Sequence, residues 1–165
     1  MVTIKVKDAL SKNEKQVKKL LKWFLRLNVL AIAVTTYLTY LHFKPSASTI
    51  CKINEYFDCD IVNKSIYSEL FGIPVSILGL LTYVLLFIVG WGLLKNKWKS
   101  KKTQRQLYWG IFGLTAFGTL YSGYLTYIEL FVLQAVCIFC LSQQIIILIN
   151  LGILYKTVRL VETDQ

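Results

Sequence analysis

The sequence predicts an all-α integral membrane protein, a bundle of four transmembrane helices with an amphipathic interfacial helix in its first external loop. Composition is the first observation behind this fold class: of the 165 residues, 55% are hydrophobic and only 17% are charged, whereas roughly a quarter of a soluble domain is charged. The second observation is a series of long uncharged runs. Only a helix, which satisfies its own backbone hydrogen bonds, can carry such runs through lipid.

Four uncharged runs mark the predicted spans, each close to or above the roughly 20 residues that a helix needs to cross the hydrocarbon core. They are Leu27 to Phe43, Leu70 to Leu94, Gln106 to Ile128 and Leu130 to Tyr155. The first run follows a long basic segment and is longer than the apolar region of a signal peptide, so we expect it to remain as a helix.

Lysine and arginine indicate the orientation of the chain in the cell (cytoplasmic) membrane. They are concentrated in three segments, residues 1–26, 95–105 and 156–159. By the positive-inside rule, both termini are cytoplasmic and the first and third connections are external. We therefore expect a basic cytoplasmic tail at 1–19, one membrane domain at 20–157 and a short cytoplasmic tail at 158–165. The net charge of +10 then flanks membrane spans, which argues against a nucleic-acid surface.

The first external connection carries one pair of cysteines, Cys51 and Cys59, which we call the loop pair. Their spacing lets the loop fold back and close a disulfide, which persists in the oxidising compartment outside the membrane. Beyond Cys59 the apolar residues recur with a helical rhythm, which predicts an amphipathic interfacial helix from Cys59 to Phe71, with Asp60 as its N-cap or first-turn acid. Gly72 is expected to end this helix and Pro74 to begin the second span.

The second pair, Cys137 and Cys140, is expected at the start of the fourth span, and we call it the inner pair. Residues at i and i+3 share one helix face, so the two sulfurs can meet, with Cys140 about one turn deeper in the membrane. A helix N-terminus also stabilises a thiolate. This placement suits thiol–disulfide exchange.

Each pair also has a simpler interpretation. The inner pair could be two small buried hydrophobic residues, and the loop pair a structural disulfide. A metal site is not expected, because His42 is the only histidine in the chain and metal sites usually combine two close ligand motifs. Together, however, the pairs indicate a redox relay in which a water-soluble thiol protein reduces the loop pair and a lipid-soluble quinone oxidises the inner pair.

Aromatic side chains around the inner pair are the predicted quinone contacts, although such residues also occur in bundle cores and at lipid interfaces. They are Phe139, Tyr121, Tyr124, Phe117 and Tyr83. Gln143, Gln144 and Asn150 are polar residues of the fourth span, and we expect them to face the bundle, because an unpaired amide is costly in lipid.

Three motifs together resemble the vitamin K epoxide reductase family, in particular its prokaryotic homologues without a fused thioredoxin domain. The motifs are Cys59, Asp60, Val62, Ser65 and Tyr67, then Phe71 to Ser76 with Gly79, then Cys137 and Cys140 at the head of the last span. The resemblance implies a four-helix bundle around a quinone. It also implies that Cys51 exchanges with the partner, Cys59 relays to Cys137, Cys140 faces the quinone and Ser65 steadies the reactive site.

The function implied by the resemblance is that of a membrane thiol–quinone oxidoreductase that drives disulfide bond formation. Its substrates would be a separate thioredoxin-fold (DsbA-like) protein and menaquinone, ubiquinone or phylloquinone. A vitamin K epoxide reductase is an alternative, but the vertebrate enzymes have an asparagine and a tyrosine where this chain has Val75 and Gln144. A second alternative is a non-enzymatic membrane protein in which the cysteines form structural disulfides. A DsbB-type protein is disfavoured, since its Cys-x-x-Cys lies in the first external loop.

Overall fold

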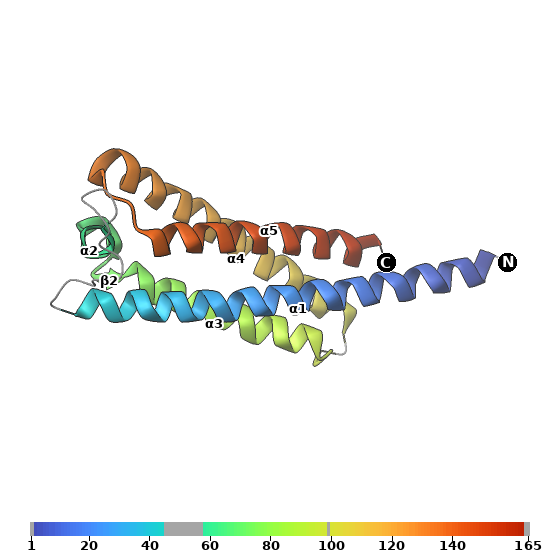
Figure 1. The fold of residues 1–165 in the computed structure, drawn as a ribbon. Helices are drawn as coiled ribbons and strands as arrows, with labels where there is room; N and C mark the ends of the chain where they lie inside the picture. Colours follow the sequence, from blue (N-terminus) through green and yellow to red (C-terminus); the bar gives the residue numbers. More distant parts are fainter. Residues whose placement is uncertain (1, 45–57, 99, 164–165) are drawn as a thin grey trace.

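A computed structural model describes residues 2–44, 58–98 and 100–163, with side chains from Asn13 onward. Four long helices make up most of it: α1 (Val2–Phe43), α3 (Val75–Leu94), α4 (Lys101–Ile128) and α5 (Ile138–Thr163). They lie side by side as an elongated bundle, with both termini toward one end and the short elements at the other (Figure 1). Cys51 lies outside the described residues.

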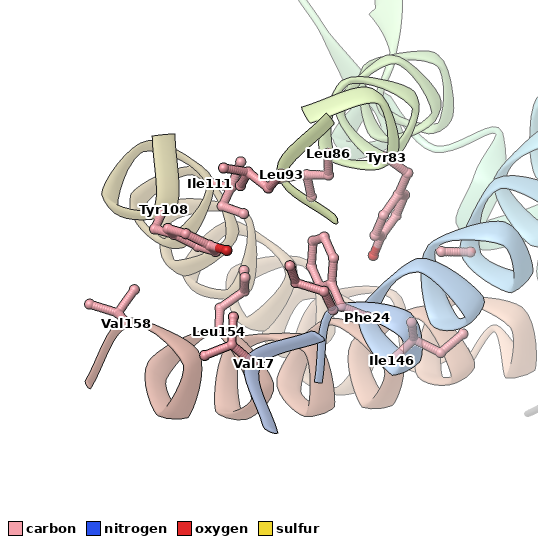
Figure 2. Packing of buried hydrophobic residues seen from close by; sticks show 12 residues of the cluster. Val17, Phe24, Tyr83, Leu86, Leu93, Tyr108, Ile111, Ile146, Leu154 and Val158 are labelled. Atoms are coloured by element: carbon pink, nitrogen blue, oxygen red, sulfur yellow. The ribbon is translucent and has the colours of Figure 1, made fainter. Parts of the chain in front are cut away.

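The long helices pack in the order α3, α1, α5, α4. Helix α1 contacts both α3 and α5, and α5 contacts α4, whereas α3 and α4 make little contact although they are consecutive in the chain. The main hydrophobic core lies between these helices (Figure 2). Phe24 of α1, Leu86 of α3 and Leu154 of α5 are fully buried there.

Three helical segments within the described residues are long and apolar enough to cross a membrane: Asn13–Phe43, Val75–Leu94 and Ile138–Thr163. The prediction of an all-α membrane protein agrees with this. Helix α4 is not among the three, because its uncharged part is rich in glycine, threonine and tyrosine and is therefore less apolar than the other spans. Its membrane span, and with it the four-span count, stays a prediction.

The structure corrects the predicted helix from Cys59 to Phe71. Helix α2 covers only Cys59–Asn63 and is followed by the short 3-10 helix η1 (Ile66–Ser68). Two short antiparallel strands follow, β1 (Glu69–Leu70) and β2 (Ile73–Pro74). We call residues 58–74 the cap, because they lie at the end of the bundle away from the termini (Figure 1).

Local backbone chemistry explains why the predicted helix is interrupted. The Asp58 carboxylate accepts hydrogen bonds from the N–H groups of Asp60 and Ile61, at 2.9 and 3.2 Å, so Asp58 is the N-cap and Asp60 is the first-turn acid. Ser65 then adopts an extended conformation, with ψ 157°. Gly72, with φ +77°, lies in the turn between the strands and does not end a helix.

Two predicted spans begin too early in the sequence. Helix α3 begins at Val75, after Pro74, because Leu70 and Ile73 are paired in the hairpin. Helix α5 begins at Ile138 and not at Leu130. The residues before it form a π-helical turn, η2 (Glu129–Leu133), which ends at Gln134 in the left-handed conformation with φ 51°. Hydrophobicity alone does not reveal these backbone turns.

Candidate functional site

Cysteines from two distant parts of the sequence meet under the cap. Cys59 of α2 and Cys137 before α5 are both buried in one small hydrophobic cluster with Leu38 of α1 and Ala135. Cys59 is disulfide-bonded, whereas Cys137 and Cys140 are free thiols. Cys59 and the inner pair are therefore adjacent but are not bonded to each other.

The inner pair forms the first turn of α5. The carbonyl of Cys137 accepts the N–H of Leu141 at 3.0 Å, and its Sγ accepts the N–H of Cys140 at 3.3 Å. Cys137 is thus the N-cap of the helix, with sulfur in place of the usual oxygen. The prediction that both cysteines share the head of the last helix is confirmed by this contact.

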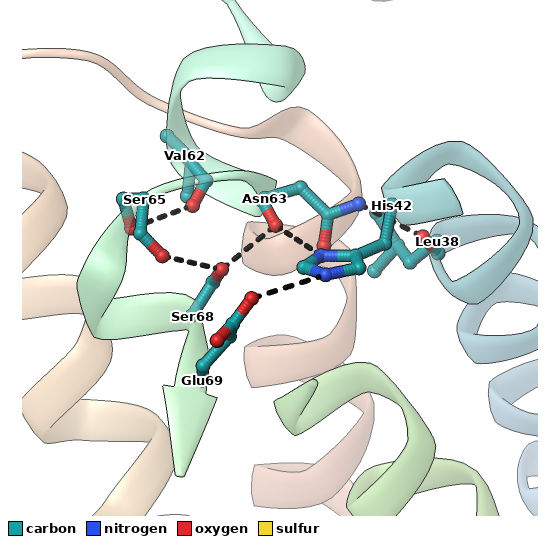
Figure 3. Close-up of polar contacts among 7 residues, drawn as sticks. All are labelled: Leu38, His42, Val62, Asn63, Ser65, Ser68 and Glu69. Atoms are coloured by element: carbon teal, nitrogen blue, oxygen red, sulfur yellow. Dashed lines mark hydrogen bonds and ion pairs between the residues drawn. The ribbon is translucent and has the colours of Figure 1, made fainter. Parts of the chain in front are cut away.

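A polar network holds the cap against the end of α1 (Figure 3). The Asn63 amide donates to the carbonyl of Leu38 at 2.8 Å. The His42 ring donates through Nδ1 to the carbonyl of Asn63 at 2.6 Å, and its Nε2 lies 3.5 Å from Oε1 of Glu69. Because Asn63 ends α2, these contacts fix the helix that carries Cys59. The sequence analysis did not identify Asn63 or Glu69.

Ser65 has a structural contact and a place in the site. Its hydroxyl donates to the carbonyl of Val62 at 2.9 Å, which stabilises the turn after α2. Ser65 also lines a mostly apolar cavity under the cap. Its predicted role beside the reactive sulfurs stays a prediction.

This mostly apolar cavity, of about 310 Å³, lies under the cap and between the cap-side halves of α1, α3, α4 and α5. We call it the inner cavity. Cys140 lines it, whereas Cys137 is not among its described lining residues. Its walls are mostly apolar and include three of the predicted quinone contacts, Tyr83, Phe117 and Tyr121.

The other two predicted contacts lie elsewhere. Phe139 is not among the lining residues, and its ring packs edge-on against Tyr37 of α1, with the centroids 5.1 Å apart. Tyr124 is 52% exposed on the outside of α4. Both side chains sit next to lining residues in sequence, but the helical period turns them to other faces.

The polar residues of α5 face the bundle, as predicted. Gln143 donates to the carbonyl of Ala31 at 2.9 Å, Gln144 accepts a hydrogen bond from Ser122, and Asn150 is fully buried. Two buried polar atoms on the wall of the inner cavity have no hydrogen-bond partner among the described residues, the Ser76 hydroxyl and Oε1 of Gln143. Buried polar groups normally have partners, so these atoms suit a ligand with polar groups of its own.

Glu129 is the functional candidate that the sequence analysis missed. Its side chain is 3% exposed, and its Oε2 accepts the N–H of Cys137 at 3.1 Å. Burial raises the pKa of Glu129 to about 7, although hydrogen bonds from the Cys137 N–H and the Cys140 side chain lower it. The only signal in the sequence was a single acidic residue in an apolar connection, eight residues before Cys137.

A bundle of long apolar helices with a free thiol pair beside a mainly apolar cavity defines a class of membrane redox proteins. Within this class, the model of the vitamin K epoxide reductase family matches residues 22–155 of the chain. The matched range contains all four cysteines and all the long helices in part or in full. The chain belongs to the vitamin K epoxide reductase family, and it is therefore an oxidoreductase of the quinone-linked kind that this family comprises.

Proposed function

We propose that this protein is a membrane thiol–quinone oxidoreductase that oxidises a thioredoxin-fold partner and thereby drives disulfide bond formation. The observation that carries the proposal is the position of Cys140. It belongs to a free thiol pair, its N–H contacts the sulfur of Cys137, and it lines the inner cavity. A thiol in this place can deliver electrons to a ligand that comes from the lipid.

The position of Cys59 beside the inner pair supports the relay order. A dithiol of the partner reduces the loop pair and leaves with a disulfide. Cys59, which shares a buried cluster with Cys137, then attacks a Cys137–Cys140 disulfide as a thiolate, so that the loop pair is reoxidised and the inner pair is reduced. The observed state, with Cys59 bonded and the inner pair free, corresponds to the stage after this transfer.

The residues of the inner cavity fit a quinone headgroup. The volume of about 310 Å³ is at the lower end of the range of small-molecule sites, roughly 300–1,000 Å³. Tyr83, Phe117 and Tyr121 would flank the ring, and the Ser76 hydroxyl would donate to a quinone oxygen. A bound quinone supplies the acceptor for two electrons and two protons. The weak contact between α3 and α4 would give the isoprenoid tail a route to lipid.

Charge supports the proposed orientation, with both cysteine pairs at the external face. Basic residues gather near the end of the bundle away from the cap, where Lys22, Arg26 and Lys95 line one groove. Arg26 lies over the ring of Trp23 and Lys95 over the ring of Trp91. Tryptophan and basic residues at this level are typical of the cytoplasmic interface. We propose that α4 crosses the membrane with the other three helices.

The decisive experiment follows quinone absorbance after the purified protein in detergent is mixed with a dithiol and a menaquinone or ubiquinone analogue. We expect the wild type to reduce the quinone and Cys140→Ala to be inactive. Ser142→Ala is the matched control, because Ser142 lies on the same turn and, among the described residues, its hydroxyl hydrogen-bonds only to the carbonyl of Ile138 within α5. Absence of activity in a folded wild type with every quinone would instead favour structural disulfides.

Epoxide reduction can be tested in the same assay by replacing the quinone with vitamin K epoxide. Val75 lines the inner cavity and offers no hydrogen bond from its side chain, and Gln144 is engaged by Ser122. These two residues therefore favour quinone reduction over epoxide reduction. Epoxide turnover comparable with quinone turnover would contradict this preference.

A further inference from the structure

One carboxyl group lies against both the inner pair and the inner cavity. Glu129 accepts the N–H of Cys137 at 3.1 Å, lies close enough to the Cys140 thiol to interact with it electrostatically, and lines the cavity. Among the described lining residues, it is the only aspartate, glutamate, lysine, arginine or histidine. A buried carboxylate is costly, so its position between the thiols and the cavity needs a reason.

This inference rests on the proposed function, and the proton chemistry of that function supplies the reason. Oxidation of the inner pair breaks two S–H bonds and forms one S–S bond, which releases two electrons and two protons. The electrons and the protons all reach the quinone, which becomes a hydroquinone. The protons need a carrier, because Cys137 is fully buried and the half-buried Cys140 opens onto the mainly apolar inner cavity, where few polar groups can accept a proton.

We propose that Glu129 is the proton carrier of the inner pair. Its carboxylate accepts the proton of the Cys140 thiol, and its carboxyl group donates that proton to a quinone oxygen in the inner cavity. The second thiol proton, from Cys137, follows the same route once Glu129 is a carboxylate again. The π-helical turn η2 holds Glu129 in place, and the N–H of Cys137 orients its carboxylate.

The electrostatic surroundings of Glu129 suit this task. From α5 it faces the two thiols of the inner pair, and from α2 the neighbouring sulfur is that of disulfide-bonded Cys59, which does not titrate. The other titratable residues that line the cavity are tyrosines, Tyr67, Tyr83 and Tyr121. The pKa of about 7 leaves the acid and the carboxylate both populated near neutral pH, as a proton carrier requires.

The test uses Glu129→Gln, which keeps an oxygen to accept the Cys137 N–H but cannot carry a proton. We expect its rate of quinone reduction at neutral pH to fall by about 100-fold or more. Glu129→Asp, which remains an acid with a shorter reach, should recover part of that rate. Glu162→Gln, an exposed change near the end of α5, is the control and should leave the rate unchanged. A melting temperature for each variant reports whether it is folded.

A second readout needs no quinone. The rate at which iodoacetamide labels Cys140 in the reduced, quinone-free protein is followed by mass spectrometry across neutral pH. The wild type and Glu162→Gln should show an inflection near pH 7, the pKa of Glu129, and Glu129→Gln should lose it. A purely structural role would leave this profile unchanged.

The two readouts separate the inference from the proposed function. A Glu129→Gln protein with the wild-type rate and the wild-type labelling profile overturns the proton-carrier role and leaves the proposed function intact. A wild type that reduces no quinone overturns the proposed function. Loss of the labelling inflection in Glu129→Gln would even then support Glu129 as the base of the inner pair.

Discussion

At the scale of single residues, Glu129 should make the stability of the protein depend on pH. Its pKa is about 7 in the folded protein against an ordinary value of 4.5. Between these values the folded protein holds a proton that the unfolded chain has lost, so the free energy of unfolding falls as pH rises. The free energy of unfolding falls by about 3 kcal/mol in total, because each unit of pKa shift corresponds to about 1.36 kcal/mol.

This loss is measurable by thermal unfolding in detergent at a series of pH values. The wild-type melting temperature should decrease from about pH 4.5 to about pH 7. Above about pH 7, Glu129 should cause no further decrease. Glu129→Gln should lack that part of the decrease, whereas Glu162→Gln should retain it. Parallel curves for the wild type and Glu129→Gln would show that burial does not raise this pKa.

The residues of the site differ in how far the sequence could predict them. The i, i+3 spacing of Cys137 and Cys140 was sufficient to place both at the head of one helix, because helical geometry alone brings them together. Glu129 was not predictable in this way. Its approach to Cys137 depends on the π-helical turn and on the left-handed conformation of Gln134, neither of which leaves a pattern in the sequence.

At the scale of secondary structure, the close packing of α3 on α1 depends on Gly90. A Cβ atom at this position would lie 3.1 Å from Cε1 of Phe24 and 3.3 Å from Cδ2 of Leu25. Gly90→Leu should therefore separate the two helices or strain Phe24, at a cost of roughly 1–3 kcal/mol. The melting temperature in detergent would report the loss.

Gly110→Leu in α4 is the control for this change, because nothing lies within 4 Å of a Cβ at Gly110. It introduces the same side chain into a long helix without the clash. Equal melting temperatures for the two variants would mean that α3 and α1 do not need the glycine.

The helices themselves were largely predictable, since uncharged runs of sufficient length can hardly adopt another structure in lipid. The cap was not. Its apolar rhythm predicted one helix from Cys59 to Phe71. The periodicity of side chains, however, carries no information about the backbone conformation, here an N-cap at Asp58, an extended Ser65 and left-handed Phe71 and Gly72. Contacts with α1 through Asn63 and His42 then decide where the cap lies.

At the scale of the whole molecule, the buried position of Cys137 limits how electrons can enter. Cys137 is fully buried beneath the cap, and Cys59 lies in the same cluster. A folded protein partner cannot reach Cys137 directly, so its electrons should pass through the loop pair. A small dithiol has less steric restriction and can reach the inner pair through the inner cavity, which Cys140 lines.

Cys51→Ala separates these two routes, although Cys51 itself lies outside the described residues. In this variant, the rate at which a reduced thioredoxin-fold protein is oxidised should fall to the background rate measured without the membrane protein. Quinone reduction by a small dithiol should continue. Cys137→Ala should abolish both reactions, because the inner pair is common to both routes. Thiol loss from the partner and quinone absorbance are measured in parallel. Normal oxidation of the partner by Cys51→Ala would mean that electrons enter the inner pair without the loop pair, against the relay order that the buried cluster of Cys59 and Cys137 supports.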